Sequence, residues 1–211
     1  ARPNFIKKVF SINILKTQEE LKGKKRYDIN VNPETKKNIC TSRSFSKEIK
    51  EYNKLKKRII SYSMRSAEKL RNQKGCAQTL TVFIQTNRFK EKRYSNAKSI
   101  IFDVATNDSL EIVKKTVENL KKIYRPNYKY KKAGVVLGGI IAEQKIQMNL
   151  FDKINRIKRK ELMNAIDKIN YLNGKETIKI GTQGIKKYKS EKQQRLSPAY
   201  TTKWKEILNV K

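Results

Sequence analysis

The sequence predicts an α+β protein built on a β-α-β-β-α-β unit, in which a four-stranded open sheet carries two helices on one face. Two long segments place apolar residues three and four positions apart, as amphipathic helices do. Two shorter segments alternate apolar and polar residues, as strands with one buried face do. The longest near-continuous apolar run, residues 133–142, is interrupted only by glycines and fits a buried strand.

The first 36 residues are expected to lie outside this unit. Residues 12–21 predict a short helix with Gly23 as its C-terminal stop. Residues 24–36 have little periodicity and predict a linker. The opening residues have the character of the middle of a helix, so we expect the sequence to be a piece of a longer protein.

The first four elements of the unit follow in order. Residues 37–45 predict a strand, and residues 52–73 predict a helix with an apolar stripe. Residues 77–86 and 99–105 predict the next two strands, with a charged loop at 87–96 between them. The side chains expected to point inward from these two strands are Leu80, Val82, Ile84, Ile100, Phe102 and Val104.

The second helix and the fourth strand complete the unit. Asp108 has the position of an N-cap, and Glu111 stands three residues later, as in a capping box. Pro126 ends the helix, and residues 128–137 predict the last strand. Because both helices cover one face of such a sheet, the other face is left free. The basic residues are numerous enough to line it.

Residues 153–211 are expected to form a separate, basic C-terminal domain of small α+β type. Residues 157–173 predict a helix, with Gly174 at its C-terminal cap position, and residues 177–180 predict a short strand. The apolar stripe of this helix is expected to consist of Ile157, Leu162, Ile166 and Ile169.

The charge of the chain points to a polyanionic partner. It has 51 Lys and Arg residues against 19 Asp and Glu, a formal net charge of +32. Neutralising phosphates releases their counterions, which favours binding to nucleic acid. A lysine-rich surface without a specific partner is the alternative. No membrane partner is expected, because the apolar run is shorter than the roughly 20 residues of a membrane span.

The sequence offers no candidate catalytic centre, cofactor or metal site. It has no histidine, the commonest general base. Gly138 and Gly139 lack the GK[ST] continuation of a phosphate-binding loop. Cys40 and Cys76 alone cannot hold zinc. Both are expected to be buried free thiols, which favours a reducing, cytoplasmic setting.

Basic and hydroxyl side chains of the predicted sheet are candidate phosphate contacts. Lys129 and Lys131 lie two residues apart on a predicted strand, so they project together. With Thr79 and Thr81 they could form a row of phosphate contacts, although a solvated sheet face is the alternative. The complete set of candidate nucleic-acid contacts is Arg43, Ser44, Lys47, Thr79, Thr81, Lys98, Lys129, Lys131 and Lys132.

Residues 147–151, called the hook below, combine one amide with large apolar side chains. Gln147, Met148, Leu150 and Phe151 suit a small hydrophobic pocket on a partner. Burial there would be worth roughly 1.5–3 kcal/mol for each of Leu150 and Phe151, less the cost of ordering the segment. Ordinary core packing after a strand remains open as the alternative.

Several blocks of the sequence match a known family in the same order. They are CTSRSF (40–45), RSAEKLR (65–71), TVFIQTN (81–87), YSN (94–96), YKKAGV (130–135), QMNLFD (147–152) and LSP with YTT (196–198 and 200–202). Together they resemble the C-terminal half of the UmuC group, the polymerase subunits of bacterial DNA polymerase V within the Y-family of translesion DNA polymerases.

The resemblance implies a division into domains. Residues 1–23 would end the thumb domain, and residues 24–36 would link it to the little finger. The little finger, residues 37–137, would grip primer–template DNA through its sheet. Residues 138–152 would be a connector with the clamp-binding motif, and residues 153–211 the C-terminal domain of the group.

The resemblance also implies partners. Gln147 would hydrogen-bond to the β sliding clamp while Leu150 and Phe151 fill its pocket, and the C-terminal domain would contact UmuD′ and RecA. Met148 stands where the motif usually has Leu, a tolerable exchange. Ala199 stands where the group usually has Arg, which puts an anion contact there in doubt.

The resemblance implies that the palm domain, whose carboxylates bind Mg²⁺, is absent from this chain. The chain alone is therefore expected not to be an enzyme, but a DNA-binding and clamp-tethering part of an error-prone polymerase of the SOS response. A stand-alone basic RNA-binding protein of ribosomal type is the alternative. Charge, size and sheet support it, but it gives no reason for the hook.

Overall fold

The computed structural model describes residues 3–29, 31, 35–152, 154–184, 197–200 and 202–207, in two compact units, Ala1–Thr35 and Lys36–Lys211. The first unit contains helices α1 (Pro3–Val9) and α2 (Ile12–Leu21). The predicted stop of α2 is confirmed, because Gly23 has a positive φ and its N–H donates to the carbonyl of Glu20. Parts of the predicted linker (30 and 32–34) and of the C-terminal domain (153, 185–196, 201 and 208–211) lie outside the described residues.

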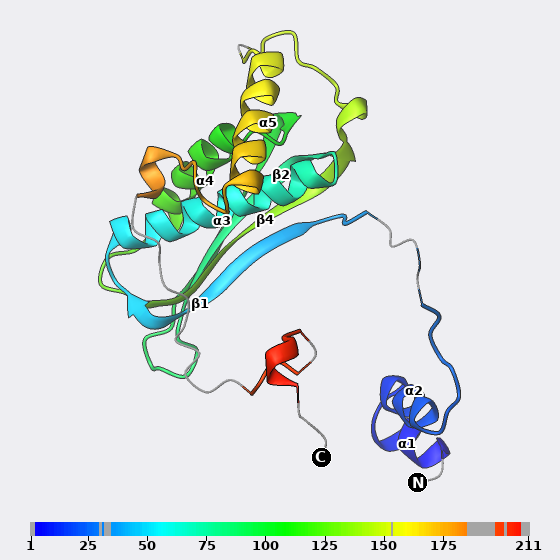
Figure 1. Ribbon diagram of the computed structural model, residues 1–211. Helices are drawn as coiled ribbons and strands as arrows, with labels where there is room; N and C mark the ends of the chain where they lie inside the picture. Colours follow the sequence, from blue (N-terminus) through cyan, green and yellow to red (C-terminus); the bar gives the residue numbers. More distant parts are fainter. Residues whose placement is uncertain are drawn as a thin grey trace. The chain divides into compact units, whose positions relative to one another are not determined.

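The second unit confirms the predicted α+β class and the order β-α-β-β-α-β. Its elements are β1 (Ile39–Ile49), α3 (Tyr52–Asn72), β2 (Gly75–Thr86), β3 (Ser95–Thr106), α4 (Ser109–Ile123) and β4 (Tyr130–Ala142). The strands pair in the order β1-β4-β2-β3, and every pair is antiparallel. Helices α3 and α4 cover the same face of this sheet (Figure 1).

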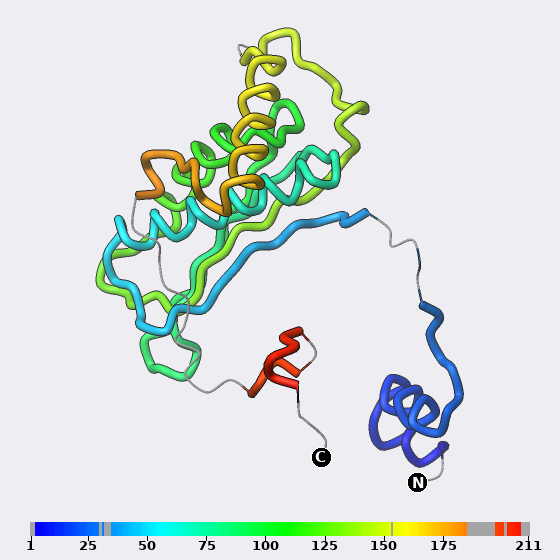
Figure 2. The backbone as a smooth tube through the Cα atoms, viewed as in Figure 1, coloured from blue at the N-terminus to red at the C-terminus, as the bar shows by residue number. Residues whose placement is uncertain are grey.

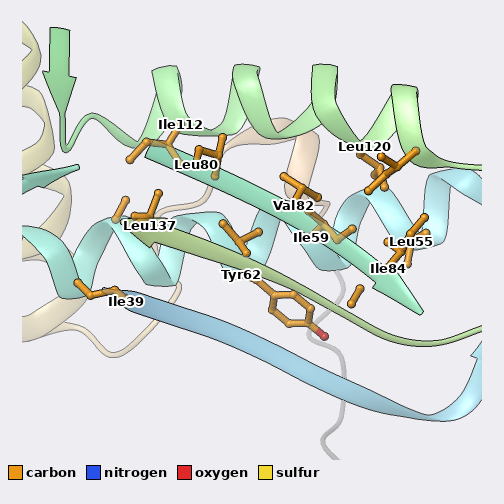
Figure 3. Packing of buried hydrophobic residues seen from close by; sticks show 14 of the residues in the cluster. Ile39, Leu55, Ile59, Tyr62, Leu80, Val82, Ile84, Ile112, Leu120 and Leu137 are labelled. Atoms are coloured by element: carbon orange, nitrogen blue, oxygen red, sulfur yellow. The ribbon is translucent and has the colours of Figure 1, made fainter. Parts of the chain in front are cut away.

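The core lies between the sheet and these two helices. The alternation predicted for β2 is confirmed, since Leu80, Val82 and Ile84 are fully buried. Figure 3 shows them with Leu137 of β4, between Ile112 and Leu120 of α4 and the side chains of α3. The alternate residues of each strand point to the opposite, uncovered face of the sheet. Burial of one set in the core therefore leaves the other set available for binding.

Strand β4 extends past its predicted end, through both glycines to Ala142. Its pairing with β2 continues at Gly138 opposite Thr79, Ile140 opposite Ala77 and Ala142 opposite Gly75. A Cβ at Gly138 would stand 2.8 Å from the hydroxyl of Thr79. The glycine therefore accommodates a close neighbour and does not end the strand.

The cap of α4 is confirmed, but the capping box is not. The Asp108 carboxylate accepts a hydrogen bond from the N–H of Leu110 at 2.9 Å. The N–H of Asp108, which a capping box would give to Glu111, donates to the hydroxyl of Thr106 instead. Glu111 forms an ion pair with Arg156, a distant residue that local sequence does not indicate.

The predicted C-terminal helix is α5 (Arg156–Leu172), and it is not part of a separate tail. It packs on the β-α-β-β-α-β unit through Met163, which is buried, and through a two-pronged ion pair between Arg71 and Asp167 at 2.6 and 2.8 Å. The predicted stripe is wrong for three of its four members, because Ile157 is 75% exposed, Leu162 44% and Ile169 37%, and only Ile166 is partly buried. Charged groups, together with Met163, determine which side of α5 faces the unit.

The predicted strand at residues 177–180 is also wrong. The side-chain amide of Asn170 accepts from the N–H of Ile178 at 2.8 Å and donates to its carbonyl at 3.3 Å, so a side chain takes the place of a partner strand. A 3₁₀ turn, η2 (Gly181–Gln183), follows. Among the described residues after 153, the structure contains no strand.

The close approach of strands at Gly134 generates a stability prediction. A Cβ there would lie 2.4 Å from the Cβ of Ser42 and 2.5 Å from the Phe83 ring. We expect Gly134→Ala to lower the free energy of unfolding by about 1–3 kcal/mol, measured by urea denaturation. Gly181→Ala is the control, because a Cβ at that position would meet no atom within 4 Å. Equal denaturation midpoints for the two variants would contradict the prediction.

Candidate nucleic-acid interface and docking segment

The sheet face away from the helices is poor in charge along its central rows. Thr81 and Ser99 face each other on it with their hydroxyl oxygens 2.8 Å apart. Register gives three rows across β1, β4, β2 and β3: Ser44, Lys132, Gln85 and Ser95; Ser42, Gly134, Phe83 and Ala97; Cys40, Val136, Thr81 and Ser99. Lys132 is the only charged residue of these rows, so this face offers hydroxyls and close backbone approach more than charge.

Four of the predicted contacts therefore share the free face: Ser44, Thr79, Thr81 and Lys132. Two others lie on the helix side of the sheet. Arg43 is paired with buried Ala133, and Lys98 is paired with buried Val82. The expectation that basic residues line the free face is wrong.

Arg43 also acts on α3 through its charge. Burial raises the pKa of the Tyr62 phenol, and the positive charges of Arg58 and Arg43 partly offset that rise. Since Tyr62 belongs to α3, the guanidinium of Arg43 is near enough to this helix for its charge to act there, in agreement with the pairing of Arg43 and Ala133.

Basic residues gather at one end of the sheet, where β1 and β2 end and β4 begins. Lys90, in the β2–β3 loop, donates to the Glu48 carboxylate at 2.9 Å. This hydrogen bond holds the pKa of Glu48 below its usual range, and the charges of Lys129 and Lys131 lower it further. Lys129 and Lys131 thus lie near the same carboxylate.

A bulge separates Lys131 from the row of hydroxyls to which the sequence assigns it. Gln85 is paired with Lys132 and Thr86 with Tyr130, so Lys131 is the extra residue. The Lys131 ammonium donates to the carbonyl of Ser46 at 3.2 Å. Lys132 therefore lies on the free face where Lys131 was expected, and the Lys132 ammonium is 6.0 Å from the centre of the Phe83 ring.

A cluster of tyrosines builds the basic end. The Tyr130 hydroxyl donates to the carbonyl of Arg125 and accepts from its N–H, both at 2.9 Å. Tyr94 and Tyr124 lie against the Tyr130 ring, with centroids 6.3 and 5.6 Å away. Burial raises the pKa of Tyr130 to about 12, so it remains a neutral donor. The sequence has four tyrosines between residues 94 and 130, which could have indicated this cluster, but sequence reasoning considered only the charged residues of this region.

Phe89 is a second feature that sequence reasoning missed. It is 84% exposed in the β2–β3 loop, and the Arg88 guanidinium lies 5.2 Å from its ring centre. Its N–H donates to the side chain of Asn87 at 3.1 Å. An exposed aromatic ring among cations is chemically suited to contact a nucleobase.

The hook is exposed, which excludes the core-packing alternative. Met148 is 62% exposed, Leu150 94% and Phe151 85%, and Gln147 is exposed as well. Asn149 holds a turn within it, because its side chain accepts from the N–H of Phe151 and its carbonyl accepts from the N–H of Asp152. Figure 2 traces the segment in yellow-green between the end of β4 and α5.

Two comparisons with known proteins agree with this arrangement. Residues 36–150 match the impB/mucB/samB family C-terminal domain, and residues 160–210 match a domain of unknown function. The first match covers more than half of the chain.

The chain belongs to the impB/mucB/samB family.

Relatives of the impB/mucB/samB family match almost the entire chain. Protein UmuC of Salmonella typhimurium is 33% identical over 209 residues, which is 98% of this chain and 50% of that protein. Protein ImpB of Salmonella typhimurium is 34% identical and Protein MucB of Escherichia coli 32%, each over 98% of this chain and 49% of the relative. The resemblance to the UmuC group is confirmed, and the chain spans about half the length of these relatives.

The described residues contain neither a metal-binding cluster nor a membrane-spanning helix. In that part of the chain, no three His, Cys, Asp or Glu side chains lie close enough to hold a metal ion. No described helix has the length and apolar character needed to cross a membrane.

The two cysteines differ, although both were expected to be buried. Cys76 is buried, but Cys40 is exposed on the free face of the sheet. Burial, with a contribution from the Glu143 carboxylate, raises the pKa of the Cys76 thiol to about 12. The thiolate is the reactive form of cysteine. Cys76 is therefore protected from alkylation and oxidation both by its burial and because its thiol stays protonated.

We expect iodoacetamide at pH 8 to alkylate Cys40 and leave Cys76 unmodified until the chain is unfolded in urea. Mass spectrometry of proteolytic fragments would follow each thiol separately. The variant Cys40→Ser is the control, and it should take up no label in the folded state. Rapid labelling of Cys76 in the folded chain would contradict the burial described here.

Proposed function

We propose that this chain is the DNA-gripping and clamp-docking part of an error-prone translesion DNA polymerase that acts in the SOS response. Membership of the impB/mucB/samB family supports the general assignment. The observation that carries the docking role is the exposure of Leu150 and Phe151 on a turn that follows the last strand.

The proposed DNA grip has two parts. Lysines at the end of the sheet, with Lys132 on the free face, supply cations that attract the phosphates. Ser44, Thr79 and Thr81 supply hydroxyls that hydrogen-bond to phosphate oxygens. Such contacts position a duplex without reading its sequence, which suits a polymerase that must accept damaged templates.

The proposed clamp contact uses the hook. Gln147 would hydrogen-bond at the rim of a hydrophobic pocket of the β sliding clamp, and Met148, Leu150 and Phe151 would fill it. The contact is expected to be of micromolar strength, because the gain from two or three apolar side chains is offset by ordering of the segment.

A weak DNA grip and a weak clamp contact strengthen each other. Linking two binding sites through a short connection raises the effective local concentration of the second site to about the millimolar range. Strand β4 begins at the proposed DNA grip and ends a few residues before the hook, so one strand connects the two contacts.

The remaining functions of the proposed polymerase lie partly outside this chain. The chain spans about half of its relatives' length, and we propose that DNA synthesis, with its Mg²⁺ ions, belongs to the other half. UmuD′ and RecA are proposed partners of residues 153–211, and a reducing, cytoplasmic setting is part of the same proposal.

Charge reversal at the sheet tests the DNA grip. We expect Lys131→Glu with Lys132→Glu to weaken binding of primer–template DNA equally on different sequences. The slope of log K against log salt should fall by about two, since two phosphate contacts are lost. Fluorescence anisotropy titrations at several salt concentrations measure both quantities. Lys121→Glu with Lys122→Glu, the same charge change on α4, is the control. An unchanged salt slope in the sheet variant would remove these lysines from the interface.

Calorimetry against a bacterial β sliding clamp tests the hook. We expect Leu150→Ala with Phe151→Ala to weaken binding at least about tenfold, because both side chains lose their burial in the pocket. The stability of the free chain should not change, since both residues are exposed. Ile157→Ala with Leu162→Ala removes exposed apolar groups of α5 and should leave the affinity unchanged. No binding by the unmodified chain would refute the clamp-docking proposal.

A further inference from the structure

The hook is open to solvent, but both of its ends are tied to the folded domain. Before the hook, the N–H of Glu143 donates to the carbonyl of Lys74 at 3.0 Å. The Glu143 carboxylate also lies 3.0 Å from the ammonium of Lys160 in α5. After the hook, Asp152 forms an ion pair with Arg156 in the first turn of α5. Helix α5 therefore contacts the chain on either side of the hook.

Arg156 joins three parts of the molecule. Its Nε lies 2.5 Å from Oδ2 of Asp152, and its Nη1 lies 3.3 Å from Oε2 of Glu111 in α4. The side chains of Arg156, Asp152 and Glu111 are 17, 11 and 16% exposed. Ion pairs so far removed from water are screened less than surface pairs, and the loss of one partner leaves the other charge unpaired.

The Asp152 carboxylate is stabilised as the anion in this network. Burial alone would raise its pKa, but the hydrogen bond from the N–H of Ile154 and the Arg156 guanidinium outweigh burial and hold the pKa below its usual range. The carboxylate thus remains charged at neutral pH and available to Arg156.

Space remains between the first part of the hook and α5. A cavity of about 260 Å³ lies there, lined in part by Cys76, Ile146, Met148, Ile154 and Met163. Because side chains on this side have room to move, the contacts at the two ends of the hook contribute more to its order than packing does. A segment of this kind loses conformational entropy when it binds unless it is ordered beforehand.

We propose that Arg156 is a positioning residue of the hook, which bridges Asp152 to Glu111 and so holds Leu150 and Phe151 outward in the form that enters a hydrophobic pocket of the partner. The inference rests on the proposed clamp contact. In this proposal α5 packs on the folded unit and also determines the conformation of the hook that precedes it.

The first measurement compares Arg156→Met with the unmodified chain in calorimetric titrations against a bacterial β sliding clamp. We expect the affinity to fall about three- to tenfold, since the ordering that Arg156 provides must then occur on binding. Arg156→Lys keeps the charge but lacks the planar fork that reaches two carboxylates, so it should restore only part of the affinity. Glu111→Gln, which leaves the contact with Asp152 intact, should have a smaller effect in the same direction.

The second measurement is hydrogen exchange in the free chain. Arg156→Met should speed exchange of the Phe151, Asp152 and Ile154 amides, which the turn protects, and leave those of β2 unchanged. Lys158→Met is the matched control, because its ammonium forms no ion pair with any residue the structure describes.

The outcomes separate this inference from the proposed function. Clamp binding that is lost in Leu150→Ala with Phe151→Ala but unchanged in Arg156→Met would overturn the positioning role alone. An equal loss in Lys158→Met would also overturn it, since net charge would then explain the effect. If the unmodified chain does not bind the clamp, the proposed contact fails, and hydrogen exchange still decides whether Arg156 orders the hook.

Discussion

The pairing of β4 between β1 and β2 is the constraint on which the rest of the domain depends. Each βαβ half brackets a strand of the other half, so neither half can bury its helix alone. Burial of Val135 and Leu137 on one side of β4 commits Gly134 and Val136 to the other. The same strand that completes the core thus exposes the face proposed to meet DNA, and its far end leads into the hook.

The division of charge over the sheet has a physical reason. Two lysines in the same cross-strand row repel each other, and small hydroxyl side chains allow a flat approach by a broad partner. Cations at one end of the sheet can attract a polyanion over several ångströms and leave close contact to hydroxyls and backbone. The tyrosine cluster around Tyr130 fixes the turn from which these lysines project.

Helix α5 shows how polar contacts can join a C-terminal segment to a domain. Met163 is its one buried apolar anchor among the described residues, and the Arg71–Asp167 and Arg156–Glu111 ion pairs orient the helix on the unit. Ion pairs contribute less to stability than a large apolar interface but fix geometry well. Several apolar side chains of α5 are exposed because the side of the helix that faces the unit carries Arg156, Met163 and Asp167.

The sequence by itself determined the fold class, the order of elements, the core side of β2 and the cap of α4, because these depend on local periodicity and local hydrogen bonds. It also identified the hook as a candidate and, through ordered blocks, the family. Tertiary structure alone decided that the hook is exposed, that Lys132 and not Lys131 shares the hydroxyl face, and that α5 faces the unit with Met163 and the ion-paired Arg156 and Asp167. A bulge at Lys131 reverses the alternation that sequence reasoning assumes, and Glu111, the partner of Arg156 in α4, lies 45 residues away. Pairings between residues distant in the chain leave no periodic signal, so only the folded chain reveals them.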